Sequence, residues 1–379
     1  MWIAWDLLTI NKLLIFKLFE ILQPFFPKDR YVLFDNLDCK NAECYEVYPF
    51  FKFLIKNKVK CNYFLKNNNI SFDKIYAETK FKNITVVKNN RNLFTNIFSF
   101  WQLLHAHTVI TSNGLGIYLN IVFKQNKYIN YVFLEHGVTY FKTVAQKYYD
   151  SNQFDYFVIL SNEEKDILCN KAGYSDKQLI CTGLPRLDYL HKKGHNKIIS
   201  IMFTYHPLEN QKHIDNVFDF VLDKKFLDLL ENNNLKLKLF IHPSDSYFFL
   251  HQKYYEKKIK CLNNIEWITN DNISKYIGLS DIFITDFSSL AFSFMYLNTP
   301  VIFYRNNIDE TASEKTIYNT FYSKEEIYKK LEFYISNNFV LEDEYKDFNN
   351  KFFDIIERGK CSINLFNKLE LIRKEKYEK

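Results

Sequence analysis

The residues from 279 to 304 constrain the fold more than any other stretch of the chain. Asp281 to Thr285 form a short apolar run with two isoleucines, which is typical of a buried parallel strand. Small polar residues up to Ser289 follow this run and precede a predicted helix over residues 290–297, and a second predicted strand covers residues 301–304. The stretch therefore predicts a strand–helix–strand unit whose polar residues lie at the carboxyl end of the first strand.

This position suits a phosphate, because the free N–H groups of a helix N-terminus and two serine hydroxyls meet there. We therefore treat Thr285, Asp286, Ser288 and Ser289 as candidates for binding a phosphate or a nucleotide. The alternative for Ser288 and Ser289 is that they only cap the helix. Asp286 would then either orient a histidine or cap the helix as well.

The alternation of strand and helix extends over most of the chain. Predicted strands cover residues 30–35, 61–65, 84–87, 108–111, 131–137 and 157–161, and residues 179–188 form a strand that runs into a Gly/Pro turn. A second series of strands covers 198–203, 235–241, 265–268, 281–285 and 301–304. Predicted helices cover residues 44–57, 93–106, 163–172 and 214–231, and further helices follow from residue 324. This order predicts an α/β fold with two doubly wound parallel-sheet, Rossmann-like domains that face a cleft. We expect the domains to cover residues 29–192 and 193–379, with the polar segment 191–197 as the linker.

The first 28 residues form a separate segment. Residues 2–26 are apolar at helical spacing, but Asp6, Lys12, Lys17 and Glu20 interrupt them too often for a membrane-spanning helix. Tryptophans at positions 2 and 5 suit the headgroup boundary of a bilayer. The segment predicts an amphipathic helix in the plane of an anionic membrane, and the alternative is a helix that packs on the protein's own core.

Composition narrows the class of protein. The 379 residues suit two domains, and a hydrophobic content of 47% is typical of a globular protein. The net charge of +6 suits an anionic membrane or phosphate-bearing substrates. The seven cysteines form no Cys-x-x-Cys pair, which favours free thiols in a reducing cytoplasm. We find no metal-ligand spacing, no run of transmembrane length, and no basic stripe or motif that indicates nucleic-acid binding.

Polar residues follow several other predicted strands. A single histidine in such a place is most often structural, and we assign His105 and His107, at a predicted helix end, to this class. The carboxyl ends of parallel strands lie at one edge of a sheet, however, so residues after different strands can form one site. The candidates at these edges are Glu135, His136, Gly137, Arg186, His206 and His242.

The order of these motifs resembles the CDP-glycerol glycerophosphotransferases, the family that builds teichoic-acid-type polymers. The strings that carry the resemblance lie within residues 108–304 and are His136-Gly137, Gly183-Leu-Pro-Arg-Leu-Asp188, His242-Pro243 and Thr285-Asp-Phe-Ser-Ser289. The resemblance implies a GT-B architecture and transfer of a polyol phosphate, such as glycerol phosphate, from a CDP-linked donor to a surface polymer or its primer, with release of CMP. It also implies no cofactor or metal and a peripheral location on the cytoplasmic face of the membrane.

The residue types suit this chemistry. Attack on the donor phosphate needs a base near the acceptor hydroxyl, and we assign this role to His136. Transfer also needs positive or N–H donors around the phosphates, which His242 and the two serines can supply. Arg186 has the fork for bidentate phosphate binding, and its alternative is a salt bridge with Asp188. Glu135, Gly137 and His206 are second-rank candidates.

Three departures from the family pattern leave other functions open. Glu135 stands where the family usually has Trp, Val138 where it has Thr, and residues 205–209 read Tyr-His-Pro-Leu-Glu where members often have Pro-Thr-Trp-Arg. The alternative is therefore a GT-B glycosyltransferase that uses a CMP- or other nucleotide-activated sugar in capsule or lipid-oligosaccharide synthesis. A third alternative is a membrane-bound scaffold without turnover, against which the presence of both His136 and His242 argues.

Overall fold

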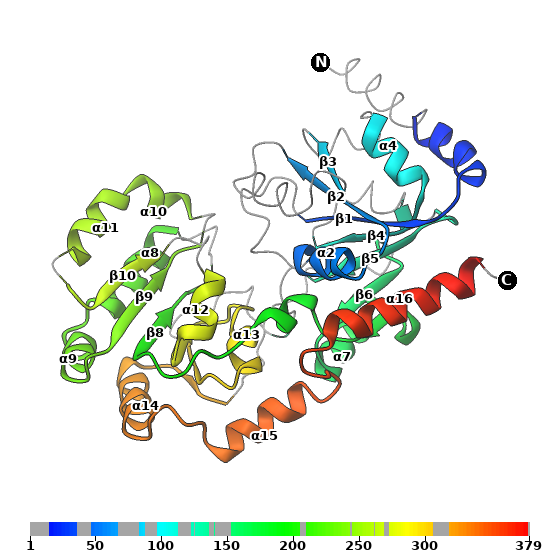
Figure 1. The fold of residues 1–379 in the computed structure, drawn as a ribbon. Coiled ribbons are helices and arrows are strands. Elements are labelled where there is room, and N and C mark those ends of the chain that lie inside the picture. Colours follow the sequence, from blue (N-terminus) through cyan, green and yellow to red (C-terminus); the bar gives the residue numbers. More distant parts are fainter. Residues whose placement is uncertain are drawn as a thin grey trace. The chain divides into compact units, whose positions relative to one another are not determined.

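The chain folds into two compact units (Figure 1). The computed structural model describes residues 15–35, 47–66, 83–87, 97–112, 123–124, 126–135, 140, 153–204, 210–242, 245–260, 262–268, 273–305 and 318–377. Unit 1 comprises Met1–His136, Val144–Tyr189 and Ile355–Lys379, and unit 2 comprises Gly137–Thr143 and Leu190–Asp354. The last residues of the chain thus group with the first unit, whereas the sequence pattern placed them in the second domain.

Unit 1 is built on a parallel sheet of seven strands among its described residues, in the order β3-β2-β1-β4-β5-β6-β7. The strands are β1 (Arg30–Phe34), β2 (Cys61–Lys66), β3 (Ile84–Val87), β4 (Ala106–Thr111), β5 (Asn130–Leu134), β6 (Tyr156–Ile159) and β7 (Leu179–Cys181). The chain reverses the direction in which it adds strands between β1 and β4. The predicted doubly wound parallel sheet is confirmed, and its switch point lies at these two strands.

Unit 2 repeats this arrangement with six strands in the part that the structure describes, in the order β10-β9-β8-β11-β12-β13. They are β8 (Ile198–Ile201), β9 (Lys236–Phe240), β10 (Ile265–Ile268), β11 (Ile282–Thr285), β12 (Val301–Tyr304) and β13 (Thr320–Phe321). All pairs are parallel, so the strands are buried on both faces and read as apolar runs. The switch point lies between β8 and β11, and the predicted strand–helix–strand unit is β11, α13 and β12.

Helices connect the strands in both units. Those of unit 1 are α2 (Val47–Lys56), α4 (Ile97–Leu104), α7 (Asn162–Ala172) and α16 (Cys361–Tyr377), with short 3-10 turns at Gln23–Phe25, Asp176–Gln178 and Pro185–Tyr189. Those of unit 2 are α8 (Asn210–Val221), α9 (Lys224–Asn232), α10 (Ser246–Leu250), α11 (Gln252–Ile259), α12 (Ile273–Leu279), α13 (Ala291–Tyr296), α14 (Lys324–Ser336) and α15 (Asp343–Phe352). The single helix predicted over residues 214–231 is two helices, because Asp223 accepts a hydrogen bond from the N–H of Lys225 and begins α9.

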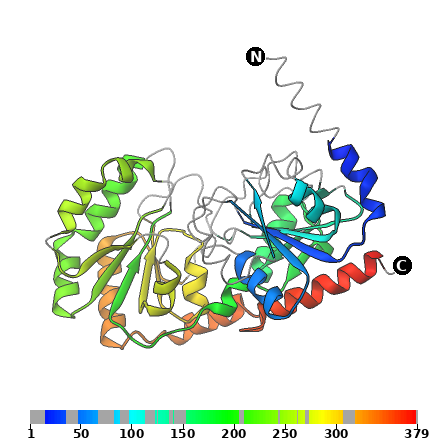
Figure 2. The same cartoon turned by 45° about the horizontal axis from the view of Figure 1, so that its top comes forward.

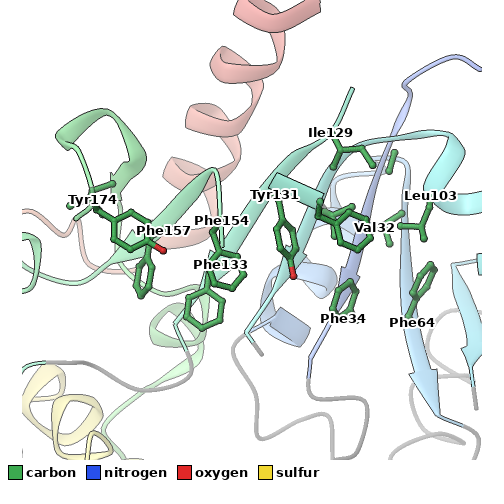
Figure 3. Packing of buried hydrophobic residues seen from close by; sticks show 14 of the residues in the cluster. Val32, Phe34, Phe64, Leu103, Ile129, Tyr131, Phe133, Phe154, Phe157 and Tyr174 are labelled. Atoms are coloured by element: carbon green, nitrogen blue, oxygen red, sulfur yellow. The ribbon is translucent and has the colours of Figure 1, made fainter. Parts of the chain in front are cut away.

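Aromatic side chains fill much of the core of unit 1 (Figure 3). Phe133 on β5 is central, with ring centroids 4.5 Å from Phe154 and 5.0 Å from Phe157 on β6. Large rings bury much apolar area per residue, and their contacts favour offset and edge-to-face geometry. The high aromatic content of the sequence therefore serves packing here.

The described part of the N-terminal segment packs on this core. Residues 15–22 are helical, and Phe19 is fully buried with its ring 5.6 Å from that of Phe100 on α4. Leu18, Ile21 and Phe25 remain exposed on the other side. The exposed positions of this helix thus include both apolar residues and the charged Lys17 and Glu20, and the predicted amphipathic pattern is not confirmed. Residues 1–14 of the predicted membrane helix lie outside the described residues.

The predicted linker, residues 191–197, is held against unit 2. The buried carboxylate of Asp281 accepts hydrogen bonds from Nδ1 of His195 at 3.0 Å and from the N–H of Asn196 at 2.9 Å. The N–H of Lys193 donates to the carbonyl of Gly278, at the end of α12, at 2.8 Å. A Cβ at Gly278 would lie 2.3 Å from the carbonyl oxygen of His191, so this approach requires glycine.

We expect Gly278→Ala to lower the free energy of unfolding by about 2 kcal/mol, because a methyl group forces the backbone of residues 191–193 away from α12. Chemical denaturation measures the change. Gly194→Ala is the matched control: Gly194 has φ +71°, but no atom lies within 4 Å of the position that a Cβ would take, so only backbone strain of about 1 kcal/mol applies. Equal destabilisation by both variants would contradict the proposed steric role.

The C-terminal helix α16, drawn in red in Figure 2, belongs to unit 1 and contacts the motif around Gly183. Gly183 has φ +74°, and a Cβ there would lie 2.9 Å from Sγ of Cys361 at the start of α16. Asp188, five residues on, accepts hydrogen bonds from the N–H groups of Cys361 at 2.8 Å and Ser362 at 2.7 Å. In the Gly-x-Pro-Arg-x-Asp motif, the glycine therefore allows the start of α16 to pack closely against the motif. The aspartate caps the N-terminus of α16.

Candidate active site

The carboxyl ends of β8 and β11 form the switch point of unit 2, where open α/β sheets bind ligands. The two strands are paired in parallel with Ile284 opposite Ile201, so the residues after each strand lie side by side. After β8 the structure describes Met202 to Thr204, and His206 lies outside the described residues. After β11 come Asp286 to Ser289, all of which the structure describes.

The Asp286 carboxylate joins the two loops. It is 7% exposed and accepts hydrogen bonds from the N–H of Thr204 at 2.9 and 3.0 Å and from the hydroxyl of Thr204 at 2.8 Å. It also accepts from the N–H of Phe287 at 2.6 Å. Asp286 therefore fixes the end of β8 against the end of β11 and positions the turn that leads to the serines.

Thr285 also holds the loops after β8 and β11 together. Its side chain is fully buried, and its hydroxyl donates to the carbonyl of Met202 at 2.6 Å. The proton of this hydroxyl is thus committed to the backbone of the neighbouring loop. We considered Thr285 as a candidate for binding a phosphate or a nucleotide, and we now assign it to shaping the site.

Ser288 and Ser289 present the donors of this turn. Ser288 is 8% exposed, and its hydroxyl accepts a long hydrogen bond of 3.3 Å from the N–H of Leu290. This contact leaves the hydroxyl proton able to donate. Ser289 is half-buried, and its carbonyl and that of Ser288 accept the first two N–H groups of α13, from Phe292 and Ala291. Among the described residues, the N–H groups of Ser288 and Ser289 have no hydrogen-bond acceptor, so they too can donate to a ligand.

His242 lies at the same edge of the sheet. It follows β9 by two residues, is half-buried, and β9 is the neighbour of β8 on the side away from β11. Its carbonyl accepts the N–H of Asp245 at 2.9 Å. The sheet thus brings His242 to the edge that also carries Asp286 and the serines.

Arg305, which follows β12 at this edge, is a residue that sequence reasoning missed. It is 3% exposed, and its N–H donates to the carbonyl of Phe321 at 2.8 Å. Burial lowers the pKa of its guanidinium, and the negative charge of Asp286 opposes this change. A buried cation therefore stands next to the loop after β11. A lone arginine after an apolar strand is the only signal that the sequence offers for it.

In unit 1, Glu135 follows β5 and its side chain is fully buried. His136 and Gly137, the next two residues, lie outside the described residues. Arg186 is half-buried in the turn Pro185–Tyr189, while Asp188 caps α16 as described above. We considered a salt bridge with Asp188 as the alternative role of Arg186, but the carboxylate of Asp188 instead accepts hydrogen bonds from the N–H groups of Cys361 and Ser362.

Of the two histidines that we assigned to structure, His105 directly follows α4 and His107 lies near the start of β4. His107 is a residue of the strand itself, so its predicted position on a helix end is wrong. Its Nδ1 lies 2.9 Å from the hydroxyl of Thr108, and burial lowers the pKa of its imidazole to about 4. A neutral, buried imidazole at the amino end of a strand is consistent with a structural role.

The switch point of unit 1 holds a buried carboxylate that no sequence motif singles out. Asp35, directly after β1, accepts hydrogen bonds from the hydroxyls of Ser112 at 2.5 Å and Tyr63 at 2.7 Å, and from the N–H of Val47 at 3.2 Å. Ser112 directly follows β4, Tyr63 lies in the middle of β2, and Val47 begins α2. Burial raises the pKa of Asp35 to about 6, although these hydrogen bonds oppose the rise.

We expect this group to make stability depend on pH. Because the pKa of Asp35 in the folded chain lies above its ordinary value of 3.8, its contribution is fully present below about pH 4 and is lost as the pH rises through about 6. The free energy of unfolding should fall by about 3 kcal/mol through this group. Denaturation curves across this pH range for the wild type and Asp35→Asn measure it, and equal pH slopes would show that Asp35 does not titrate there.

Within the described part of the chain, no group of three or more His, Cys, Asp or Glu side chains is placed to hold a metal ion. No helix among the described residues has the length and apolar character needed to cross a membrane.

The sequence matches the family model described as CDP-Glycerol:Poly(glycerophosphate) glycerophosphotransferase over residues 54–370. It is 23% identical to the minor teichoic acid biosynthesis protein GgaB of Bacillus subtilis (strain 168), an alignment that covers 82% of this chain and 36% of GgaB. It is 26% identical to the teichoic acid ribitol-phosphate primase of Bacillus spizizenii (strain ATCC 23059 / NRRL B-14472 / W23), with coverage of 45% and 46%. The chain thus spans less than half the length of these two relatives.

A third relative is similar in length. The teichoic acid poly(glycerol phosphate) polymerase of Bacillus spizizenii (strain ATCC 23059 / NRRL B-14472 / W23) is 24% identical, and the alignment covers 74% of this chain and 75% of that protein.

Solved structures support the fold. The wall teichoic acid polymerase TagF superposes with a TM-score of 0.66 at 16% identity, and the alignment covers 94% of this chain and 92% of the TagF chain. The UDP-GlcNAc 2-epimerase of Methanocaldococcus jannaschii superposes with a TM-score of 0.58 at 12% identity and covers 90% and 99%. Two doubly wound units, the serine-bearing turn after β11 and the family match over most of the sequence lead to one conclusion: this chain belongs to the CDP-glycerol:poly(glycerophosphate) glycerophosphotransferase family.

Proposed function

We propose that this protein transfers a polyol phosphate, such as glycerol phosphate, from a CDP-linked donor to a cell-surface polymer or its primer and releases CMP. The observation that carries the proposal is the turn after β11, where Ser288 and Ser289 offer hydroxyl and N–H donors at a sheet switch point. Family membership supports it, as does the TagF structure soaked with CDPG, which superposes with a TM-score of 0.65.

In this proposal unit 2 binds the donor. Ser288 and Ser289 donate hydrogen bonds to the phosphates, His242 supplies a further donor from the next strand end, and the cation of Arg305 adds positive charge behind them. Asp286 and Thr285 hold the turn in shape through Thr204 and Met202. Arg186 of unit 1 stays a candidate for phosphate binding through its guanidinium fork.

The acceptor hydroxyl reacts at the β-phosphorus of the donor. A new oxygen–phosphorus bond forms, the bond from that phosphorus to the bridging oxygen breaks, and CMP leaves with this oxygen. We propose that His136 takes the proton of the acceptor hydroxyl, since a neutral imidazole titrates in the required range. Hydrogen-bond donors stabilise the charge on the phosphates during transfer, so the reaction as proposed uses no cofactor.

A nucleotide-activated sugar is the second candidate donor. The buried carboxylate of Glu135, next to His136, supports this second candidate. The family usually has Trp at this position, so the pocket for the transferred group differs here. An acidic residue can accept hydrogen bonds from sugar hydroxyls, which an indole cannot do.

Purified protein incubated with CDP-glycerol, CDP-ribitol and CMP-activated sugars tests the proposal, with CMP release and product mass as readouts. We expect CMP release from a CDP-polyol that depends on an added polymer or primer acceptor. Turnover of a CMP-sugar alone would replace the proposal with the glycosyltransferase alternative, and donor binding without turnover of any donor would favour the scaffold.

We also propose that the protein works at the cytoplasmic face of the membrane as a peripheral protein, bound to anionic lipid. The apolar segment of residues 1–28, with Trp2 and Trp5, supports this location.

A further inference from the structure

The chain leaves unit 1 directly after His136, the proposed base. Residues Gly137–Thr143 group with unit 2, and the chain returns to unit 1 at Val144. Within this short segment Tyr140 is buried, with 8% of its surface exposed. Four residues of chain span at most about 14 Å, so a side chain that is fixed at position 140 limits the positions that His136 can take.

Tyr140 packs in an aromatic cluster of unit 2. Its ring centroid lies 6.1 Å from that of Phe292 on α13 and 5.4 Å from that of Phe352 on α15, and both contacts are edge-to-face. Phe292 and Phe352 stack on each other at 4.9 Å and are fully buried. We call these three residues the Tyr140 cluster. Because such contacts are favourable and the rings bury much apolar area, the cluster attaches the segment that follows His136 to α13.

The surface that receives Tyr140 is itself held in place. The side-chain amide of Asn349 on α15 is buried and donates a hydrogen bond to the carbonyl of Met295 on α13 at 3.0 Å. Asn349 lies three residues before Phe352, so the two residues lie on the same face of α15. Two contacts about one turn apart therefore hold α15 against α13, and Tyr140 packs against fixed neighbours.

The same helix carries the proposed donor site at its start. The N–H of Phe292 donates to the carbonyl of Ser289 at 3.2 Å, so the residue that contacts Tyr140 is bonded to one of the two serines. Asp286 and Thr285 hold the serine-bearing turn independently of Tyr140, because they bind the loop after β8. Loss of the Tyr140 ring should therefore release the segment after His136 and leave the donor turn in shape.

We propose that Tyr140 is a positioning residue for the transfer reaction, which anchors the chain after His136 to α13. Tyr140 itself touches neither donor nor acceptor in this proposal and acts through the chain that carries the base. The inference rests on the proposed function, in which His136 takes the proton of the acceptor hydroxyl. Its loss should lower the rate of transfer more than donor binding, because catalysis depends on the exact position of the reacting groups.

Tyr140→Ala tests the proposal through CMP release from CDP-glycerol with a poly(glycerol phosphate) acceptor. We expect kcat to fall by about 10- to 100-fold, whereas the Kd for CDP-glycerol should change less than about threefold. Tyr140→Phe keeps the ring and should retain kcat within about threefold of the wild type.

Tyr296→Ala is the matched control. Tyr296 is buried at the other end of α13, and its ring makes an edge-to-face contact with Phe353 at 5.7 Å. This variant also removes an aromatic contact of α13, but Tyr296 does not belong to the segment that follows His136. It should retain kcat within about threefold of the wild type.

Combining Tyr140→Ala with His136→Ala separates positioning from a general loss of structure. If Tyr140 acts through His136, the combined variant should lose no more activity than His136→Ala alone. Losses that multiply would overturn the inference. Wild-type kcat in Tyr140→Ala would also overturn it, as would an equal loss in Tyr140→Phe or Tyr296→Ala.

Hydrogen exchange of the peptide that covers α13 tests the anchor without turnover. Tyr140→Ala should speed exchange in this peptide several-fold, because α13 loses a packing partner. An unchanged exchange rate would overturn the inference whatever the activity. Wild-type protein that releases no CMP from any cytidine-linked donor, together with faster exchange in Tyr140→Ala, would refute only the proposed transfer and leave the anchor in place.

Discussion

Replacing His136 by alanine is expected to lower transfer by about 10²- to 10⁴-fold while the affinity for the donor changes little. The proposed base acts on the acceptor hydroxyl, so its loss removes a step that donor binding does not need. Turnover and donor binding are measured on the same folded sample. His251→Ala is the control, because His251 is exposed at the start of α11 and its Nδ1 lies 2.9 Å from the carbonyl of Tyr247.

The pH profile gives a second readout for His136. A base with the usual imidazole pKa near 6.5 loses activity as the pH falls below about that value. The acid limb of the profile should therefore be present in the wild type and in His251→Ala. Turnover of His136→Ala within a few-fold of the wild type would remove His136 from the mechanism.

The double replacement Ser288→Ala with Ser289→Ala is expected to weaken binding of a CDP-linked donor by roughly a hundredfold or more. Hydrogen bonds to a charged phosphate contribute roughly 1.5–3 kcal/mol each, and the variant removes two hydroxyl donors. Isothermal titration measures the affinity, and a thermal melt beside it measures folding. The loss of the weak contact to Leu290 should cost about 1 kcal/mol or less of stability.

Ser293→Ala is the matched control for this pair. Ser293 lies on the same helix, α13, but is fully buried, so its replacement should leave donor affinity unchanged. An unchanged affinity in the Ser288 and Ser289 variant, together with a lower melting temperature, would mean that the serines only shape the start of α13. The donor phosphates would then bind elsewhere.

The strands of both units could be predicted from the sequence because parallel strands are buried on both faces and read as apolar runs. β1, β2, β11 and β12 lie within two residues of their predicted bounds. The order of the strands in space could not be predicted, since it depends on pairings between residues far apart in the chain. The two-residue strand β13 was not predicted, because Thr320 and Phe321 are too few residues to show the apolar pattern of a strand.

The same distinction between local pattern and distant pairing applies to the candidate site. Residues directly after strong strands, such as Asp286, Ser288 and His242, could be found because the end of a strand is visible in the sequence. Their partners could not be found. The hydroxyl of Thr204 binds Asp286 across 82 positions, and the capping of α16 by Asp188 spans 173 positions. Buried polar groups such as these and Arg305 depend on tertiary contacts that no local pattern records.

The return of α16 has a consequence for synthesis of the chain. Glu370 on this helix accepts a hydrogen bond from Tyr31 on β1 at 2.6 Å, and Lys376 donates to the carbonyl of Ile129 at 2.7 Å, just before β5. A ribosome makes these residues only after it has made all of unit 2. During translation, unit 1 therefore waits with the surface that α16 will cover still in water, while unit 2 can complete its own sheet first. The nascent first unit is the stage at which this protein most needs protection from aggregation.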